Sequence, residues 1–148
     1  MADEAHESIY IEASPERCYA VAIDYERYPE WATDVKEVDV TDRDDEGRGT
    51  RVKYKISALG QTIGYILAYD YTAAPGGFSW NLEKAQVLSR LDGTYRFDPD
   101  GAGTRVSYVL VVDITVPLPG FMKRAAAGMI VNNAMKQLKE YVEAGGGT

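Results

Sequence analysis

The sequence has few of the residues that metal centres and thiol or histidine catalysis require. Its 148 residues include a single histidine, His6, and a single cysteine, Cys18. A transition-metal site needs several converging histidine, cysteine or carboxylate ligands, and one cysteine cannot form an internal disulfide. Cys18 lies beside Tyr19 and Val21 in a predicted short helix, so we interpret it as a small buried hydrophobic residue. We therefore expect neither a metal nor another cofactor.

Basic residues and long apolar runs are also scarce. The chain has 16 lysines and arginines against 23 aspartates and glutamates, which gives a net charge of -7. This charge repels phosphate backbones, so we expect no nucleic-acid partner. The sequence has no N-terminal apolar run flanked by basic residues and no uninterrupted apolar run of roughly 18 residues. These absences predict a cytoplasmic protein without a signal peptide or stable membrane insertion, and they leave open whether it is a monomer or a homodimer.

Length and composition predict one globular domain. A chain of 148 residues that is 45% hydrophobic and 26% charged is long enough to bury a core. We expect residues 1–148 to form a single domain. Its flexible ends are predicted at residues 1–5 and at residues 144–148, where three consecutive glycines stand.

Most of the chain before residue 115 alternates apolar and polar side chains, which predicts strands. The clearest alternation places Val52 and Tyr54 on one face and Arg51 and Lys53 on the other. Short turns, such as the one at Gly60, separate consecutive strands and therefore predict an antiparallel meander. The strands are expected near residues 6–12, 35–41, 51–58, 63–71, 78–82, 91–97 and 105–114.

Two short helices are predicted between the first and second strands. Ser14, Pro15 and Glu16 form a strong helix start, because a hydroxyl caps the free N–H groups and proline suits the first turn. Asp24 is expected to cap a second, very short helix over residues 25–28, which Pro29 closes.

A long amphipathic helix is predicted over residues 119–142. Its apolar stripe has members three or four residues apart, namely Phe121, Ala125, Gly128, Asn132, Met135, Leu138 and Val142. The simplest way to bury this stripe is to lay the helix across the sheet. The small residues in its middle indicate either a cavity or close packing of helix on sheet.

Several short motifs stand in a characteristic order: IEASPE at residues 11–16, YPEW at 28–31, GTY at 93–95, GTRV at 103–106 and PLPGF at 117–121. With the order of the predicted elements, they resemble the START-like or SRPBCC superfamily, in particular its polyketide cyclase/dehydrase and lipid-transport branch. The resemblance implies an α+β helix-grip fold. In that fold a curved antiparallel sheet of about seven strands has two short helices after strand one and a long C-terminal helix packed across it. The resemblance also implies a deep apolar cavity between the sheet and this helix.

Tyrosine is abundant where such a cavity would lie. The chain has 11 tyrosines against 3 phenylalanines, and several fall on predicted inward positions. A buried hydroxyl requires a partner, so these tyrosines indicate a ligand-holding or water-holding cavity; alternatively, their rings lie near strand ends and their hydroxyls reach solvent. The predicted ligand-binding residues are Trp31, Tyr54, Tyr65, Leu67, Tyr69, Trp80, Tyr95, Tyr108, Leu110, Ala125, Gly128, Met129, Asn132 and Met135.

We expect the protein to bind or carry a small hydrophobic molecule, such as a lipid, an isoprenoid quinone or a polyketide-like aromatic, and we assign no catalytic residue. One alternative is a polyketide cyclase/dehydrase that uses pocket tyrosines and asparagines. The aromatases that the chain resembles use a pocket arginine, whereas four arginines here fall on outward positions: Arg51, Arg90, Arg96 and Arg105. The other alternative is a protein-interaction or toxin–antitoxin component without a ligand, which predicts a filled core and an exposed apolar patch.

Overall fold

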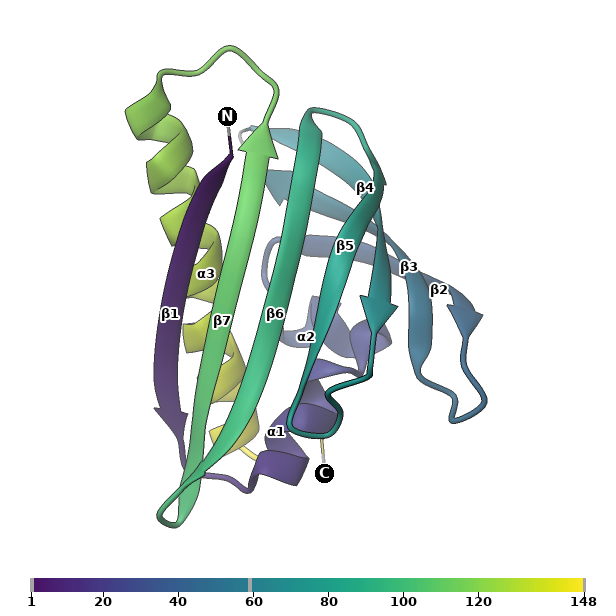
Figure 1. The fold of residues 1–148 in the computed structure, drawn as a ribbon, viewed down its shortest axis with the longest axis vertical. Helices are drawn as coiled ribbons and strands as arrows, with labels where there is room; N and C mark the ends of the chain where they lie inside the picture. Colours follow the sequence, from purple (N-terminus) through teal and green to yellow (C-terminus); the bar gives the residue numbers. More distant parts are fainter. Residues whose placement is uncertain (1, 59, 148) are drawn as a thin grey trace.

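The computed structural model describes residues 2–58 and 60–147 and shows one curved sheet with its helices on one side (Figure 1). The strands are β1 (Asp3–Ile11), β2 (Val35–Arg43), β3 (Gly49–Ala58), β4 (Gln61–Asp70), β5 (Gly77–Ala85), β6 (Leu88–Asp100) and β7 (Gly103–Ile114). The helices are α1 (Pro15–Ala22), the 3₁₀ turn η1 (Tyr25–Arg27), α2 (Tyr28–Trp31) and α3 (Gly120–Glu143). The predicted α+β helix-grip architecture is confirmed.

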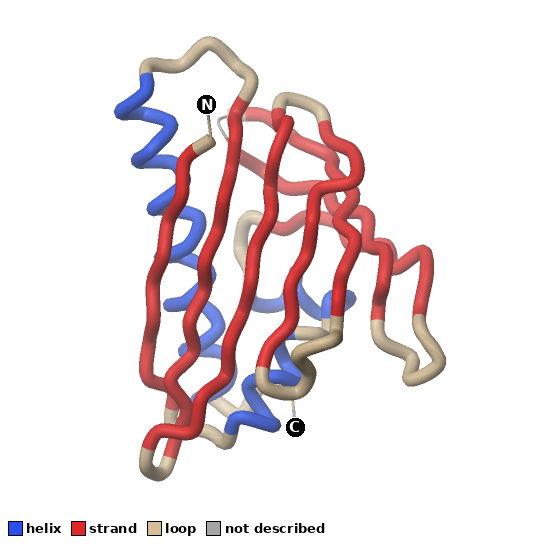
Figure 2. The backbone as a smooth tube through the Cα atoms, viewed as in Figure 1, coloured by secondary structure: helices blue, strands red, loops and turns tan. Residues whose placement is uncertain are grey.

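The seven strands form a single antiparallel sheet in the order β1-β7-β6-β5-β4-β3-β2. Strands β2 to β7 are consecutive neighbours. Strand β1 pairs with β7 and forms one edge of the sheet, and β2 forms the other. The β2–β4 end turns across the view, whereas β1, β7 and β6 run nearly upright (Figure 2). The helices therefore lie on the concave side of the sheet, which places any enclosed site between them and the inward side chains.

The inward positions predicted from alternation are confirmed. Val52 and Tyr54 on β3 are buried, while Arg51 and Lys53 beside them are exposed. Tyr54 lies directly opposite Tyr65 on β4, so both inward faces are in register. Because side chains alternate with a period of two, this register carries the apolar face continuously across the sheet.

The two N-terminal helices begin as their sequence requires, with one correction. The Ser14 side chain accepts a hydrogen bond from the backbone N–H of Arg17, which confirms the predicted cap of α1. Asp24 makes no capping hydrogen bond, and Pro29 lies in the first turn of α2 instead of ending a helix. The prediction was wrong there because proline fits the first helical turn, where no backbone N–H donor is needed.

Helix α3 packs mainly against β1 and β7, and its buried side chains are Ala127, Val131, Met135, Leu138 and Val142. The predicted stripe is confirmed for its last three members. It is wrong for Phe121, Ala125, Gly128 and Asn132, which are exposed. A helical stripe can continue in steps of three or of four residues. In the first half of α3 both choices lead to apolar or small residues, so the sequence pattern alone does not show which face is buried.

Both ends of the described chain are held by hydrogen bonds. Strand β1 begins at Asp3, so residues 3–5, which were predicted to be flexible, pair with residues 110–112 of β7. At the other end, the Arg17 guanidinium donates to the carbonyls of Val142 and Gly146 at 2.7 and 3.0 Å. The glycine tail therefore turns back onto α1 at residues 144–147; residues 1 and 148, also predicted to be flexible, lie outside the described part of the chain.

Candidate functional site

An aromatic layer covers the concave face of the sheet. Tyr95 on β6 and Tyr108 on β7 are direct cross-strand partners with ring centroids 4.6 Å apart. Trp80 on β5 lies 5.6 Å from the Tyr95 ring and 5.5 Å from the Tyr108 ring. Tyr54 and Tyr65 extend the layer with centroids 5.3 Å apart. Aromatic pairs at these distances pack favourably, so large aromatic rings form the sheet side of the interior.

Trp80 is seated directly over Gly93, its cross-strand partner on β6. A Cβ atom at position 93 would lie 2.6 Å from Cε2 and 2.8 Å from Cη2 of the indole, and closer still to Cζ2. No real Cβ atom makes such contacts, so the indole occupies the space that a side chain would need. The GTY motif at residues 93–95 therefore supplies both the seat of Trp80 and an inward tyrosine.

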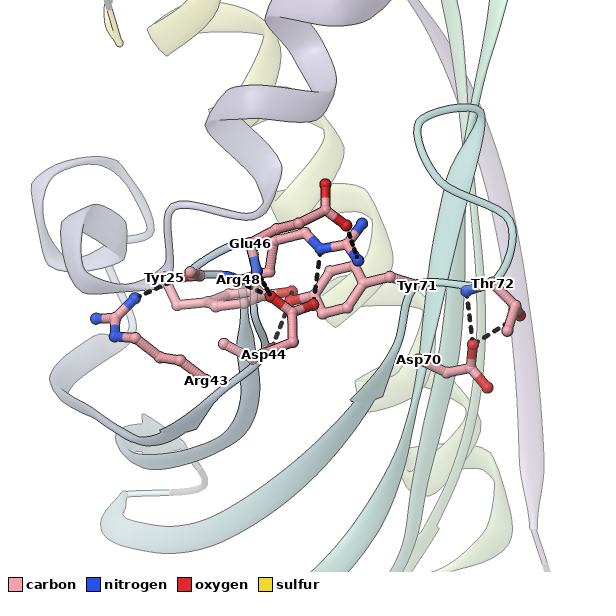
Figure 3. A network of polar contacts seen from close by, with 10 residues as sticks. Tyr25, Arg43, Asp44, Glu46, Arg48, Asp70, Tyr71 and Thr72 are labelled. Atoms are coloured by element: carbon pink, nitrogen blue, oxygen red, sulfur yellow. Dashed lines mark hydrogen bonds and ion pairs between the residues drawn. The ribbon is translucent and has the colours of Figure 1, made fainter.

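Some tyrosine hydroxyls are satisfied within the protein. Tyr71 donates to the carbonyl of Gly49, so its oxygen accepts the 2.8 Å hydrogen bond from the Tyr25 hydroxyl. The Arg48 guanidinium lies 4.5 Å from the centroid of the Tyr71 ring and donates to Asp44 at 2.8 Å (Figure 3). Burial raises the pKa of Tyr71 to about 12. Through this network, Tyr25 of η1 is joined to Arg48 in the β2–β3 turn and to Tyr71, which directly follows β4.

The inward tyrosines near the middle of the sheet fall into two groups. The hydroxyls of Tyr54 and Tyr69 share a 2.6 Å hydrogen bond. The hydroxyls of Tyr65, Tyr95 and Tyr108 make no hydrogen bond with any described residue, yet none of the three oxygens is fully buried. Desolvation by burial raises the pKa of all three phenols, so they remain neutral hydrogen-bond donors.

One flank of α3 lies toward α2 and the segment that follows it. Tyr141 stacks on Trp31 with centroids 5.9 Å apart, and Gln137 donates to the Thr33 hydroxyl at 2.9 Å. These contacts join α3 to α2 and the segment that follows it. Helical spacing continues the same flank through Asn133, Ile130 and Ala126, which are partly buried or, for Ile130, 39% exposed.

The structure brings most predicted lining residues together. The sheet residues Tyr54, Leu67, Trp80, Tyr95, Tyr108 and Leu110 are buried, Tyr65 and Tyr69 are partly buried, and Trp31 and Met135 are buried at the helices. Ala125, Gly128, Met129 and Asn132 are exposed on α3 instead, so the expectation that they face inward is wrong. Sequence reasoning missed the flank residues Ala126 and Ile130. They could have been found from a second helical stripe, which runs through the buried residues Ala127 and Val131 beside them.

The predicted outward arginines are confirmed. Arg51, Arg90, Arg96 and Arg105 are exposed and form ion pairs with carboxylates. A hollow of about 250 Å³ also lies on β2–β3, but its lining includes the exposed Glu37–Lys55 ion pair, which marks a solvated surface. Within residues 2–58 and 60–147, no cluster of three metal-ligating side chains occurs. No helix in the same part of the chain has the length and apolarity of a membrane span.

Comparison with known proteins decides the family. The family model described as polyketide cyclase/dehydrase and lipid transport matches residues 3–143. The chain belongs to this family. A comparison with curated protein sequences gives no match.

Solved structures agree with the polyketide cyclase/dehydrase and lipid-transport family assignment. A START superfamily protein of Mycobacterium smegmatis is 24% identical, with a TM-score of 0.89 over 95% of this chain and 97% of that one. An aromatase/cyclase from Streptomyces sp. R1128 is 14% identical, with a TM-score of 0.76 over 100% of both chains. A STAR-related lipid transfer protein from Xanthomonas axonopodis is 17% identical, with a TM-score of 0.69 over 94% of this chain and 85% of that one. At these identities the likeness establishes the shared fold.

Proposed function

We propose that the protein binds a small hydrophobic molecule between the concave face of the sheet and α3. The observation that carries this proposal is the incomplete burial of apolar side chains on that face. Ile56 on β3, Tyr65 on β4 and Leu82 on β5 occupy inward positions but stay partly exposed. Exposed apolar surface on an inward face costs free energy that a bound apolar molecule would recover.

The packing of α3 explains why this surface is left uncovered. The helix lies mainly on β1 and β7, at one side of the sheet, whereas Ile56, Tyr65 and Leu82 belong to strands nearer the other side. The Trp31–Tyr141 stack closes the end near α2. On α3, the opposite wall is formed by Ala126 and Ile130. The family membership and the lipid-transfer and aromatase/cyclase neighbours support the same proposal.

A matched pair of substitutions tests the site. Ala126→Trp places an indole on the α3 flank that faces the sheet, while Ala125→Trp places the same indole on the exposed face. The neutral fluorescent probe N-phenyl-1-naphthylamine should bind the native protein and the Ala125→Trp variant alike. Its affinity should fall at least about tenfold in Ala126→Trp, because the added ring would occupy the ligand's space. Equal loss in both variants, or no binding to the native protein, would contradict the proposal.

Native mass spectrometry of the purified protein provides a second test. A small apolar compound that remains bound in the gas phase and is released on denaturation would support carriage and reveal its chemical class. A panel of lipids, quinones and aromatic polyketides should raise the thermal unfolding temperature if any of them binds the native state selectively. Failure of the whole panel, together with failure of the fluorescent probe, would leave the ligand-binding proposal without support.

Cyclase/dehydrase chemistry is the finer alternative for the same cavity. The groups proposed for this chemistry are the neutral inward phenols and the amide of Asn133, which is partly buried on α3. They would orient a carbonyl or exchange a proton through hydrogen bonds. If the protein were a cyclase, Tyr95→Phe would abolish turnover of a poly-β-ketone while retaining its binding. A carrier would show a change in affinity alone.

A second candidate function rests on the surface of α3. Phe121, Met122, Met129 and Ile130 are between 39% and 65% exposed, which is a large apolar exposure for one helix. This surface favours contact with another apolar surface and agrees with the interaction hypothesis. Phe121→Ser and Met129→Ser should then abolish self-association or partner binding in sedimentation experiments, with probe binding unchanged.

A further inference from the structure

Three tyrosines supply the polar groups of the proposed cavity. The rings of Tyr95 and Tyr108 are only 5% and 7% exposed, and Tyr65 is partly buried. Their hydroxyls nevertheless lack a hydrogen-bond partner among the described residues, and all three oxygens retain accessible surface. A buried donor without a partner is unfavourable, so these accessible hydroxyls take their acceptor from outside the chain, either from water or from a bound molecule.

Several neighbouring tyrosines find hydrogen-bond partners within the protein. Tyr25 and Tyr71 bond to each other, Tyr54 bonds to Tyr69, and Tyr28 donates to the carbonyl of Ala22. The Tyr19 hydroxyl is also unpaired but is fully buried, whereas the hydroxyls of Tyr65, Tyr95 and Tyr108 combine a missing partner with accessible surface. Tyr95 and Tyr108 are cross-strand partners, so their hydroxyls leave the sheet side by side.

The same region is free of charge. Thr104 is the only polar or charged residue that is buried in the described chain, and its hydroxyl donates to the carbonyl of Ala13 at 2.7 Å. Burial raises the pKa of Tyr65, and burial together with neighbouring tyrosines raises the pKa values of Tyr95 and Tyr108, with no charged side chain among the causes. An anionic group placed here would lose its hydration without gaining a cation, which is strongly unfavourable.

We infer that the ligand is a neutral, oxygen-bearing molecule whose carbonyl or ether oxygens accept hydrogen bonds from Tyr65, Tyr95 and Tyr108. This inference rests on the proposed function and narrows it. It selects ketones, quinones and similar neutral ring compounds over fatty acids and phospholipids, whose anionic groups would have no counter-charge inside. The apolar rings around the hydroxyls bind the rest of the molecule.

Compounds with similar fused two-ring skeletons test the inference. 1-Tetralone carries one carbonyl, tetralin lacks it, and 1-naphthoate carries an anionic carboxylate. Their dissociation constants are measured by two-dimensional ¹H–¹⁵N NMR titration of the full chain. We expect 1-tetralone to bind roughly 3- to 10-fold more tightly than tetralin, the gain of one net hydrogen bond, and 1-naphthoate to bind no more tightly than tetralin.

Substitutions assign the effect to the hydroxyls. Tyr95→Phe and Tyr108→Phe, singly and together, should bring the ratio of the two dissociation constants toward one while the affinity for tetralin stays unchanged. Tyr10→Phe is the matched control, because Tyr10 pairs with the exposed Arg105 on the outer face of the sheet. Thermal unfolding confirms that each variant is folded.

The outcomes separate this inference from the proposed function. Binding of tetralin with a ratio that Tyr95→Phe and Tyr108→Phe leave unchanged would overturn the inference and keep the proposed function. Tightest binding of 1-naphthoate would likewise overturn the neutral ligand class. Absence of binding by both neutral compounds would overturn the proposed function and the inference together.

Discussion

The contact between Trp80 and Gly93 gives the sharpest prediction from this structure. Replacing Gly93 with alanine adds one methyl group where the indole now lies, at 2.6 and 2.8 Å from Cε2 and Cη2. Trp80 is 6% exposed, with the Tyr69 ring 5.8 Å and the Tyr95 ring 5.6 Å away, so moving the indole would disturb its packing in the aromatic layer. The substitution must displace the indole or the backbone of β6.

The expected magnitude follows from two opposing effects. Overpacking of a well-packed core costs about 1–3 kcal/mol, and the severity of this contact favours the upper half of that range. Alanine is favoured over glycine in a strand by roughly 0.5–1 kcal/mol. The free energy of unfolding should therefore fall by about 1–2 kcal/mol, which lowers the melting temperature by roughly 2–8 °C in a chain of this size.

Gly128→Ala is the matched control, because the same chemical change should have the opposite sign. Apart from its chain neighbours and the adjacent backbone of α3, no described atom lies within 4 Å of the Cβ position at Gly128, in the middle of the helix. Replacing an open helical glycine with alanine should raise the free energy of unfolding by up to about 1 kcal/mol. The two variants share their gain in backbone propensity and differ only in the contact that the methyl group makes.

Urea denaturation, followed by circular dichroism, measures both variants. A double-mutant cycle with Trp80→Leu isolates the contact, since leucine lacks the ring atoms that approach position 93. Gly93→Ala should then cost less in the Trp80→Leu background than in the native protein. The reasoning is refuted if Gly93→Ala is neutral or stabilising, or if its cost is the same in both backgrounds.

Three further predictions concern stability. Ser14→Ala removes the cap that accepts from Arg17 and should lower the free energy of unfolding by about 1 kcal/mol, while Ser14→Asp should retain it, as measured by urea denaturation. Thr104→Val removes the hydroxyl of a fully buried residue, which leaves the part-buried Ala13 carbonyl without its donor, and should cost about 1–3 kcal/mol by the same assay, whereas Thr104→Ser should cost less. Burial raises the pKa of Tyr71 to about 12 and the pKa values of other inward tyrosines as well, so the unfolded state ionises first and stability should fall as the pH rises above about 10. Absorbance at alkaline pH should show these tyrosines ionising only with unfolding; early, non-cooperative ionisation would contradict their burial.

Much of the fold was predictable because local chemistry and tertiary packing agree. Ser14 and Pro15 favour a helix start through local contacts, and the alternation around Val52 and Tyr54 leaves one choice of inward face. The short turns fixed the meander, since antiparallel strands need no long connection. The order of elements then matched the family that the sequence comparison confirms.

The rotation of α3 was not predictable from periodicity. Phe121 offered an apolar start for a stripe that runs through Ala125 and Gly128, but the helix buries Ala127 and Val131 instead. Small residues allow close approach on several faces, so their order does not distinguish the face in contact from its neighbours. The position of β1 and β7 beneath the helix decides between them.

Alternation, capping and charge are local properties, so the strands, the helices, the inward tyrosines and the outward arginines could be predicted from the residues alone. Which hydroxyls find partners depends on the tertiary structure. Tyr54 meets Tyr69, whereas Tyr95 and Tyr108 are left unpaired, although all four lie on the same inward face. A hydrogen bond depends on the distance and direction between groups on different strands, and the curvature of the sheet sets both.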